Sequence, residues 1–229
     1  MGVAILGRKV KGIFIERPNR FEAIVELEGK KERVHVPNTG RMHEMLHPGT
    51  PVMVTESDNP KRKTRYSLQF VEKRGHWICI HSALANRVWE EAARSGDFDW
   101  VQGEIKREVS YGNSRMDFHI SGEPPTLVEV KCATYEEDGV AMFPDAPTVR
   151  GQRHVKELIQ AVEEGAYRGA IVFMVFMDFV THFTPHTRID PVLAEGLKKA
   201  EGAGIDIRAY TCKIEWDEIK LDREIPVIL

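Results

Sequence analysis

The chain has 229 residues, of which 42% are hydrophobic and 29% are charged, as in a soluble globular protein with one large or two small domains. Its formal net charge of −3 excludes a uniformly basic surface, so contacts with nucleic acid must come from local patches. The longest apolar run, residues 170–177, is far too short to cross a membrane, and the first residues do not resemble a signal peptide. Three distant cysteines (Cys79, Cys132 and Cys212) favour reduced thiols in a cytoplasmic protein over a disulfide framework.

The first eighty residues have the pattern of a small β-barrel. Short segments rich in β-branched and aromatic residues alternate with turns that contain proline, glycine or asparagine. Five or six strands in this length are typical of an oligonucleotide-binding (OB) barrel. The expected strands cover residues 10–16, 23–27, 33–36, 51–55, 66–73 and 77–80.

After Ser82 the pattern changes to helices alternating with strands. Ser82 is a suitable N-cap for a helix through Arg94, and the pair Asp190-Pro191 marks the start of another helix. The run 170–177 lacks alternation, which indicates a central strand buried on both faces. The remaining expected elements are a helix at 148–164 and strands at 105–111, 115–120, 126–133 and 205–214. The order predicts an α/β (α+β) two-domain protein, with an OB-like barrel at 1–81 and an α/β domain at 82–229.

Two acids and a lysine are the most informative residues. Glu129 and Lys131 are two positions apart on an expected strand and therefore share a face, while Val130 points the other way. Asp117 lies on the preceding expected strand, so an antiparallel pair can bring the three side chains together. Two carboxylates suit Mg²⁺, and the lysine could position or deprotonate a metal-bound water for phosphodiester hydrolysis. The alternative is a solvated charge pair on an exposed strand face.

Six sequence blocks occur in an order that resembles the sugar fermentation stimulation protein (SfsA) family. They are VPNTGRM (36–42), SDNPKRK (57–63), ANR (85–87), SRMDF (114–118), VEVKCAT (128–134) and FPDAPTVRGQRHVKEL (143–158). The resemblance extends from about residue 10 to the C-terminal PVIL. It implies an OB barrel, a C-terminal domain with the fold of PD-(D/E)xK nucleases, and DNA binding without marked sequence preference. The family also has a regulatory role in sugar metabolism attached to it.

On the nuclease motif, Asp117 matches the metal-binding Asp, Glu129 the second acid and Lys131 the catalytic Lys, although Met116 replaces the proline of the motif name. The resemblance thus implies a Mg²⁺ or Mn²⁺ site at Asp117 and Glu129. Three functions remain open: a metal-dependent nuclease, a non-catalytic DNA-binding regulator that keeps the site as a clamp, and a small-molecule phosphoesterase or ligand sensor.

Two expected helices supply further candidate residues. Glu91 lies on the first helix, where related folds often contribute an extra acid to the metal; its neighbour Glu90 is the alternative. Arg150, Gln152 and His154 lie at the start of the second helix, where backbone N–H groups suit a phosphate. The alternative is that Gln152 and His154 cap or pack that helix end.

The barrel domain contains a basic segment with interleaved aromatic residues. Such a segment can follow the phosphates of a single strand of DNA or RNA and stack on its bases. A solvated hairpin is the alternative. The expected nucleic-acid contacts are Asn38, Arg41, Lys61, Arg62, Lys63, Arg65 and Tyr66.

The segment 43–47 spells the H-E-x-x-H motif of zinc proteases. That chemistry needs both histidines on one face of a stable helix. Gly40 before the segment and Pro48-Gly49 after it leave room for about two turns, so we exclude a zinc protease.

Overall fold

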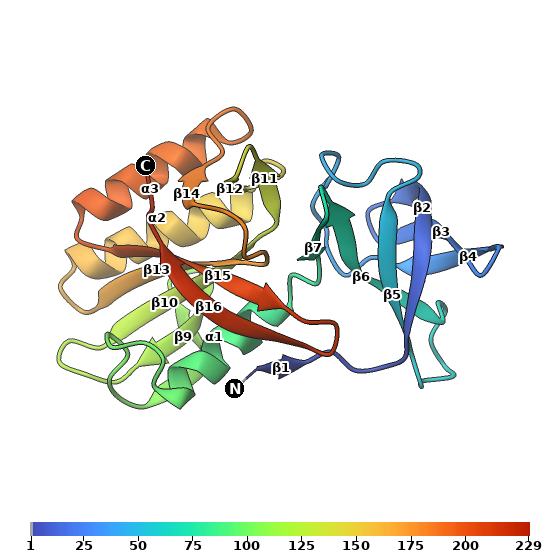
Figure 1. Ribbon diagram of the computed structural model, residues 1–229. Coiled ribbons are helices and arrows are strands. Elements are labelled where there is room, and N and C mark those ends of the chain that lie inside the picture. The colour runs from blue at the N-terminus through green and yellow to red at the C-terminus, as the bar shows by residue number, and fades with distance from the viewer. Residues whose placement is uncertain (1) are drawn as a thin grey trace.

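The computed structural model describes residues 2–229, which form two lobes of unequal size (Figure 1). The smaller lobe is a β-barrel, and the larger lobe is a sheet with helices on both faces. The two-domain α+β organisation expected from the sequence is therefore confirmed. Within residues 2–229, no helix is long and apolar enough to span a membrane.

The barrel is closed by one parallel contact between strands that are otherwise antiparallel. Its strand order is β4-β3-β2-β5-β6-β7, and β4 also pairs with β6 through Val34 and Tyr66, so five strands form a complete circle. The strands are β2 (Lys9–Asn19), β3 (Glu22–Leu27), β4 (Lys30–His35), β5 (Pro51–Glu56), β6 (Tyr66–Lys73) and β7 (His76–Cys79). Val25, Val34 and Leu68 are fully buried inside, which provides the apolar core of an OB barrel.

The larger lobe is built on a seven-stranded sheet of order β1-β16-β15-β13-β10-β9-β8. Its strands are β1 (Val3–Ala4), β8 (Ile105–Tyr111), β9 (Ser114–Ile120), β10 (Thr126–Ala133), β13 (Arg168–Val175), β15 (Asp206–Ile214) and β16 (Glu218–Ile225). The central strand β13 is parallel to both β10 and β15. A small second sheet, not expected from the sequence, contains β11 (Tyr135–Glu137), β12 (Val140–Phe143) and β14 (His182–Pro185).

Helices cover both faces of this sheet. Helix α1 (Leu84–Ser95) packs on one face, and α2 (Val149–Glu163) and α3 (Pro191–Gly202) pack on the other. Successive residues of β13 point to opposite faces, so Val172 belongs to the core cluster of Trp89 and Phe173 to that of Leu158. The prediction that this strand is buried on both sides is confirmed.

The helix N-termini are capped unequally. At α3, the side chain of Asp190 accepts a hydrogen bond from the N–H of Leu193 (2.9 Å), as the Asp-Pro pair predicts. The prediction of Ser82 as the cap of α1 is wrong. Helix α1 begins at Leu84 without a side-chain cap, because the Ser82 hydroxyl is directed to the barrel, where it donates to the carbonyl of Pro37 (3.4 Å).

The chain passes from the barrel to the larger lobe between β7 and α1. The first residues do not belong to the barrel, since β1 pairs with β16 at the edge of the large sheet. The histidine motif at 43–47 lies in turns and bends and contains no helix.

Candidate active site

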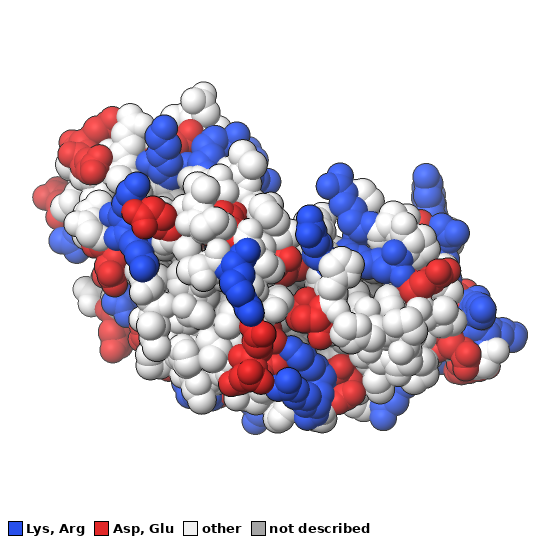
Figure 2. Space-filling model, turned by 90° about the horizontal axis from the view of Figure 1, so that it is seen from above, with Lys and Arg blue, Asp and Glu red and all other residues white. Residues whose placement is uncertain are grey.

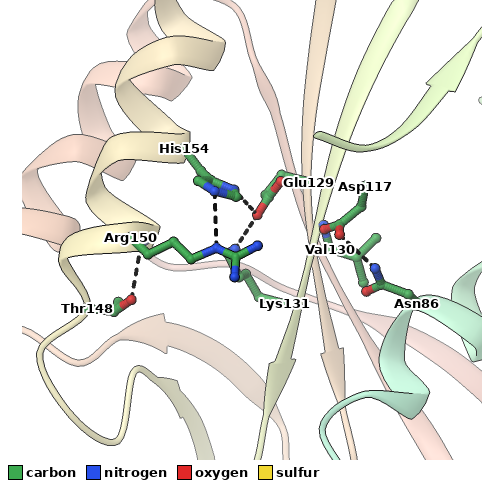
Figure 3. A network of polar contacts seen from close by, with 9 residues as sticks. Asn86, Asp117, Glu129, Val130, Lys131, Thr148, Arg150 and His154 are labelled. Carbon is green, nitrogen blue, oxygen red and sulfur yellow. Dashed lines mark hydrogen bonds and ion pairs between the residues drawn. The ribbon is translucent and has the colours of Figure 1, made fainter. Parts of the chain in front are cut away.

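The candidate active site lies where β9 and β10 separate. Their antiparallel pairing ends at Phe118 and Val128. Past this point, the N–H of Val130 donates to Oδ2 of Asp117 (2.8 Å) and the amide of Asn86 on α1 donates to Oδ1 (2.7 Å), as Figure 3 shows. Burial, and secondly the charge of Glu129, raise the pKa of Asp117 above its ordinary value. The separating strands and α1 thus hold one carboxylate in a defined place.

Glu129 is the second carboxylate and is almost completely buried, with 2% of its surface exposed. Its Oε1 accepts hydrogen bonds from Nδ1 of His154 (2.6 Å) and from the ammonium group of Lys131. Burial alone would raise the pKa of Glu129, but the bond from His154 and the charge of Lys131 lower it below the ordinary value. Glu129 is therefore held as a charged carboxylate inside the protein.

The proton on His154 can be assigned from its two partners. Arg150 Nε, which can only donate, lies 3.3 Å from His154 Nε2, so that nitrogen carries the lone pair. A ring proton is then on Nδ1, where it faces the carboxylate of Glu129. Arg150, His154 and Glu129 form a chain from the exposed start of α2 to the buried strand (Figure 3).

The structure brings Asp117, Glu129 and Lys131 into one cluster, whereas their chemical roles stay predictions. Val130 belongs to the core cluster on the α1 side, so Glu129 and Lys131 share the opposite face as the strand period requires. Oε2 of Glu129 is buried and has no hydrogen-bond partner among residues 2–229. A buried, unpartnered carboxylate oxygen beside a second carboxylate is a donor set that fits a hard divalent cation.

Glu91 is not brought into this site. Within the described part of the chain, no group of three or more His, Cys, Asp or Glu side chains is arranged to hold a metal. Asn86 is the residue of α1 that contacts Asp117. Glu91 is five residues further along the helix, which corresponds to a rotation of roughly 140° about the helix axis, so its side chain points away from Asp117. The alternative acid, Glu90, pairs with Arg94 (2.9 Å) and with Arg107 (3.2 Å).

Asn86 is the site residue that sequence reasoning missed. Its only signal was its place in the ANR block, because an asparagine inside an amphipathic helix has no distinctive spacing. Its role becomes visible only when α1 is packed next to β9.

The three candidates at the start of α2 have different environments. Gln152 donates to Oδ1 of Asp190 (2.9 Å) and so connects α2 to the start of α3. His154 is buried against Glu129, and Arg150 is exposed. The packing alternative therefore describes Gln152 and His154, and Arg150 is the one of the three that is free to meet a phosphate.

In the barrel, the basic segment contains residues with and without an ion-pair partner. Lys61 and Lys63 are exposed and form no ion pair with another described residue. Arg65 is paired with Glu56. The expectation that Tyr66 stacks on a base is wrong, because its ring is part of the barrel core, with 7% exposed, and the Arg65 guanidinium lies 5.3 Å from the ring centre.

The loop after β4 is held by its own hydrogen bonds. The amide of Asn38 donates to the carbonyl of Ile80 (3.0 Å), and its side-chain oxygen accepts from the N–H of Gly40 (2.8 Å). A Cβ at Gly40 would lie 1.9 Å from the carboxylate of Asp145, so this loop meets the larger lobe at a glycine. Asn38 thus has a structural role, and Arg41 is the exposed residue of the loop.

A closed OB barrel followed by an α/β domain with an Asp-Glu-Lys cluster defines the two-domain class to which this chain belongs. The chain matches the family models "SfsA N-terminal OB domain" over residues 15–80 and "Sugar fermentation stimulation protein RE domain" over residues 83–218. It belongs to the sugar fermentation stimulation protein (SfsA) family.

Relatives of the same family match over nearly their whole length. The sugar fermentation stimulation protein homolog of Clostridium tetani is 46% identical over 221 residues, which cover 94% of this chain and 95% of that protein. The homolog of Caldanaerobacter subterraneus is 43% identical over 223 residues, with 96% and 97% covered. The solved structure of Pyrococcus furiosus SfsA in complex with Ca²⁺ has a TM-score of 0.90 at 35% identity, and 100% of each chain is covered.

Proposed function

We propose that this protein binds DNA and hydrolyses its phosphodiester bonds with Mg²⁺ or Mn²⁺ at Asp117 and Glu129. The observation that carries the proposal is the proximity of the half-buried Asp117 to the buried Glu129, which has an unpartnered oxygen and lies next to Lys131. The family relative from Pyrococcus furiosus, solved in complex with Ca²⁺, supports a divalent cation in this family.

Each residue has a role that its contacts support. Asp117, fixed by Val130 and Asn86, and Glu129, through its free oxygen, would hold the cation. The cation, when bound, would polarise the phosphate and lower the pKa of a bound water. The ammonium group of Lys131 has three N–H donors, and Glu129 uses one, so the others can orient the attacking water or hold a phosphate oxygen.

The charges around the site suit a nucleic-acid backbone. Figure 2 shows Lys and Arg side chains on both lobes, with a hollow between the lobes on this face. Among the candidate contacts, Arg41, Lys61, Arg62, Lys63, Arg65 and Arg150 are exposed, and of these Arg65 is ion-paired with Glu56. Exposed cations that replace the counterions of phosphates provide affinity without sequence preference.

A non-catalytic DNA-binding regulator is the second candidate function. The observation that favours it is the saturation of Glu129 Oε1 by both Lys131 and His154. In that arrangement the lysine neutralises the acid and the cluster serves as a structural ion pair.

The deciding experiment is cleavage of labelled single- and double-stranded DNA and of RNA with Mg²⁺ or Mn²⁺. We expect wild type to cut and Asp117→Ala and Lys131→Ala to lose at least about a hundredfold in rate. The exposed residues Asp99→Ala and Lys106→Ala are the charge-matched controls and should cut like wild type. Equal cutting by all variants would identify a contaminant, and no cutting by wild type on any substrate would favour the regulator.

Metal binding can be measured separately from cleavage. Addition of Mg²⁺ or Ca²⁺ should raise the melting temperature of wild type, because a ligand that binds the native state stabilises it. At a ligand concentration of a hundred times the dissociation constant, the free energy of unfolding rises by about 2.7 kcal/mol. Asp117→Asn removes one ligand charge and should abolish the shift. A shift that persists in this variant would place the cation elsewhere.

A further inference from the structure

A cavity lies between the barrel, the N-terminal segment and α1. Its volume is about 360 Å³, which is within the range of small-molecule pockets. None of Asp117, Glu129 and Lys131 lines it, so it is separate from the candidate active site.

The floor of this cavity is a hydrogen-bonded polar network on β5 and β6. The amide of Gln69 donates to the hydroxyl of Thr55 (3.0 Å), and its carbonyl oxygen lies 3.0 Å from Nδ1 of His81. Gln69 and Thr55 are 6% and 5% exposed. Phe70 and Cys79 of the barrel are apolar and belong to the same core cluster as α1. The buried Gln69 and Thr55 are polar instead, which costs free energy unless they are hydrogen-bonded.

Two arginines on different elements lie at this floor. Arg62, from the loop before β6, donates to the hydroxyl of Ser67 (2.8 Å), which holds its guanidinium over the cavity. Arg87, on α1, also lines the cavity and makes no hydrogen bond or ion pair with a described residue. A guanidinium has five N–H donors, so both arginines have donors available for a ligand.

The two histidines of the cavity lie close to its arginines. Burial, and then the charges of His35, Arg87 and Arg62, lower the pKa of His81 to about 4. Burial and Arg62 likewise lower the pKa of His35, against a smaller opposite effect of Glu22. His35 on β4, Arg87 on α1, Arg62 before β6 and His81 after β7 all line the cavity, and its positive charge comes from the two arginines.

Two acids at the rim do not cancel this charge. Glu56 is paired with Arg8 (2.8 Å) and also with Arg65, so two cations compensate one carboxylate. Asp58 lies on the exposed loop that follows β5. Asp58 can offset at most one of the two arginine charges of Arg62 and Arg87, so the cavity keeps a net positive charge.

We infer that this cavity binds a phosphate group, with Arg62 and Arg87 as its paired donors. Two guanidinium forks suit the several oxygens of a phosphate. The remaining wall is apolar and includes Ile5 and Leu6 of the N-terminal segment, and Leu6 is 83% exposed. A cavity with a cationic floor and an apolar side suits a nucleoside phosphate, either free or at the end of a nucleic-acid strand.

The test is calorimetric titration in metal-free buffer with inorganic phosphate, a nucleoside 5′-monophosphate and the unphosphorylated nucleoside. We expect the monophosphate to bind and the nucleoside not to bind. Equal affinity for inorganic phosphate would identify free phosphate as the ligand. If wild type binds neither phosphate compound at concentrations up to about 10 mM, the inference is overturned.

Variants locate the binding in the cavity. Arg62→Ala combined with Arg87→Ala should weaken the monophosphate at least about tenfold, because two charge-assisted hydrogen bonds are lost. Arg87→Lys should recover part of the loss relative to Arg87→Ala, and Arg94→Ala on the same helix is the matched control. Asp117→Ala should bind like wild type, which separates this inference from the proposed hydrolysis. Undiminished binding by the folded double variant, with folding checked by its melting temperature, would contradict the inference.

Discussion

The backbone N–H of Val130 donates to the carboxylate of Asp117 (2.8 Å) where β9 and β10 stop pairing. In an uninterrupted ladder, this N–H would be satisfied by a carbonyl of the neighbouring strand. The side chain takes the place of that carbonyl, so the sheet can open without leaving a buried donor unpaired. The opening is the place where the two carboxylates meet.

Asn86→Ala should reduce both stability and activity. The variant removes the amide that donates to Asp117 (2.7 Å), and hydrogen bonds to charged groups contribute about 1.5–3 kcal/mol. We expect the free energy of unfolding in urea to fall by about 1–2 kcal/mol and metal-dependent cleavage to decrease with it. Asn113→Ala, at an exposed turn position, is the control. An unchanged free energy of unfolding for Asn86→Ala would show that this contact does not fix Asp117.

His154→Ala should be more costly, because His154 is buried with 3% exposed and donates to the charged Glu129. The loss of this bond and the cavity that remains should together cost about 3 kcal/mol, measured by urea unfolding. His154→Asn places an amide N–H near the position of Nδ1 and should recover part of that stability. If alanine and asparagine are equally destabilising, the bond to Glu129 contributes nothing and only volume matters.

Glu44→Gln should change how stability depends on pH. Burial, assisted by the charge of Asp145, raises the pKa of Glu44 from 4.5 to about 7, against the opposite effects of its own backbone N–H and of Lys73. The folded state then binds more protons than the unfolded state between these two values, so the stability of wild type falls as pH rises through this window.

Glu44→Gln cannot ionise, so we expect it to exceed wild type by about 1–2 kcal/mol at pH 8 and to match it at pH 4, once partial exposure is allowed for. Urea unfolding at both values measures the difference, with the exposed Glu28→Gln as the control. A constant gap across this range would mean that Glu44 titrates normally.

Charge reversal at Lys61 and Lys63 should weaken DNA binding. Both side chains are exposed and without an ion-pair partner among described residues, so each can replace one counterion of a phosphate. The double variant should lower the slope of log affinity against log salt by about 2. The same reversal at Lys30 and Lys31, the exposed first residues of β4, should leave the slope unchanged. Equal effects of both pairs would indicate a response to net charge alone.

The sequence by itself determined the three helices, the barrel strands, five strands of the large sheet and the shared face of Glu129 and Lys131. Strand period places side chains two apart on one face, and the Asp190-Pro191 pair marks a helix start, because both effects act within a few residues. The apolar run at 170–177 likewise predicted a strand buried on both sides. Such local rules also identified the OB barrel from its turns.

Only the tertiary structure decided which groups complete the site. Asn86 is 31 residues from Asp117, and His154 is 25 residues from Glu129, so packing of α1 and α2 on the sheet sets both contacts. Packing of α1 also directs Glu91 away from the site, and closure of the barrel at the Val34–Tyr66 pair buries Tyr66 in the barrel core. Side-chain composition specifies what a helix can present, whereas its neighbours in space specify what it does present.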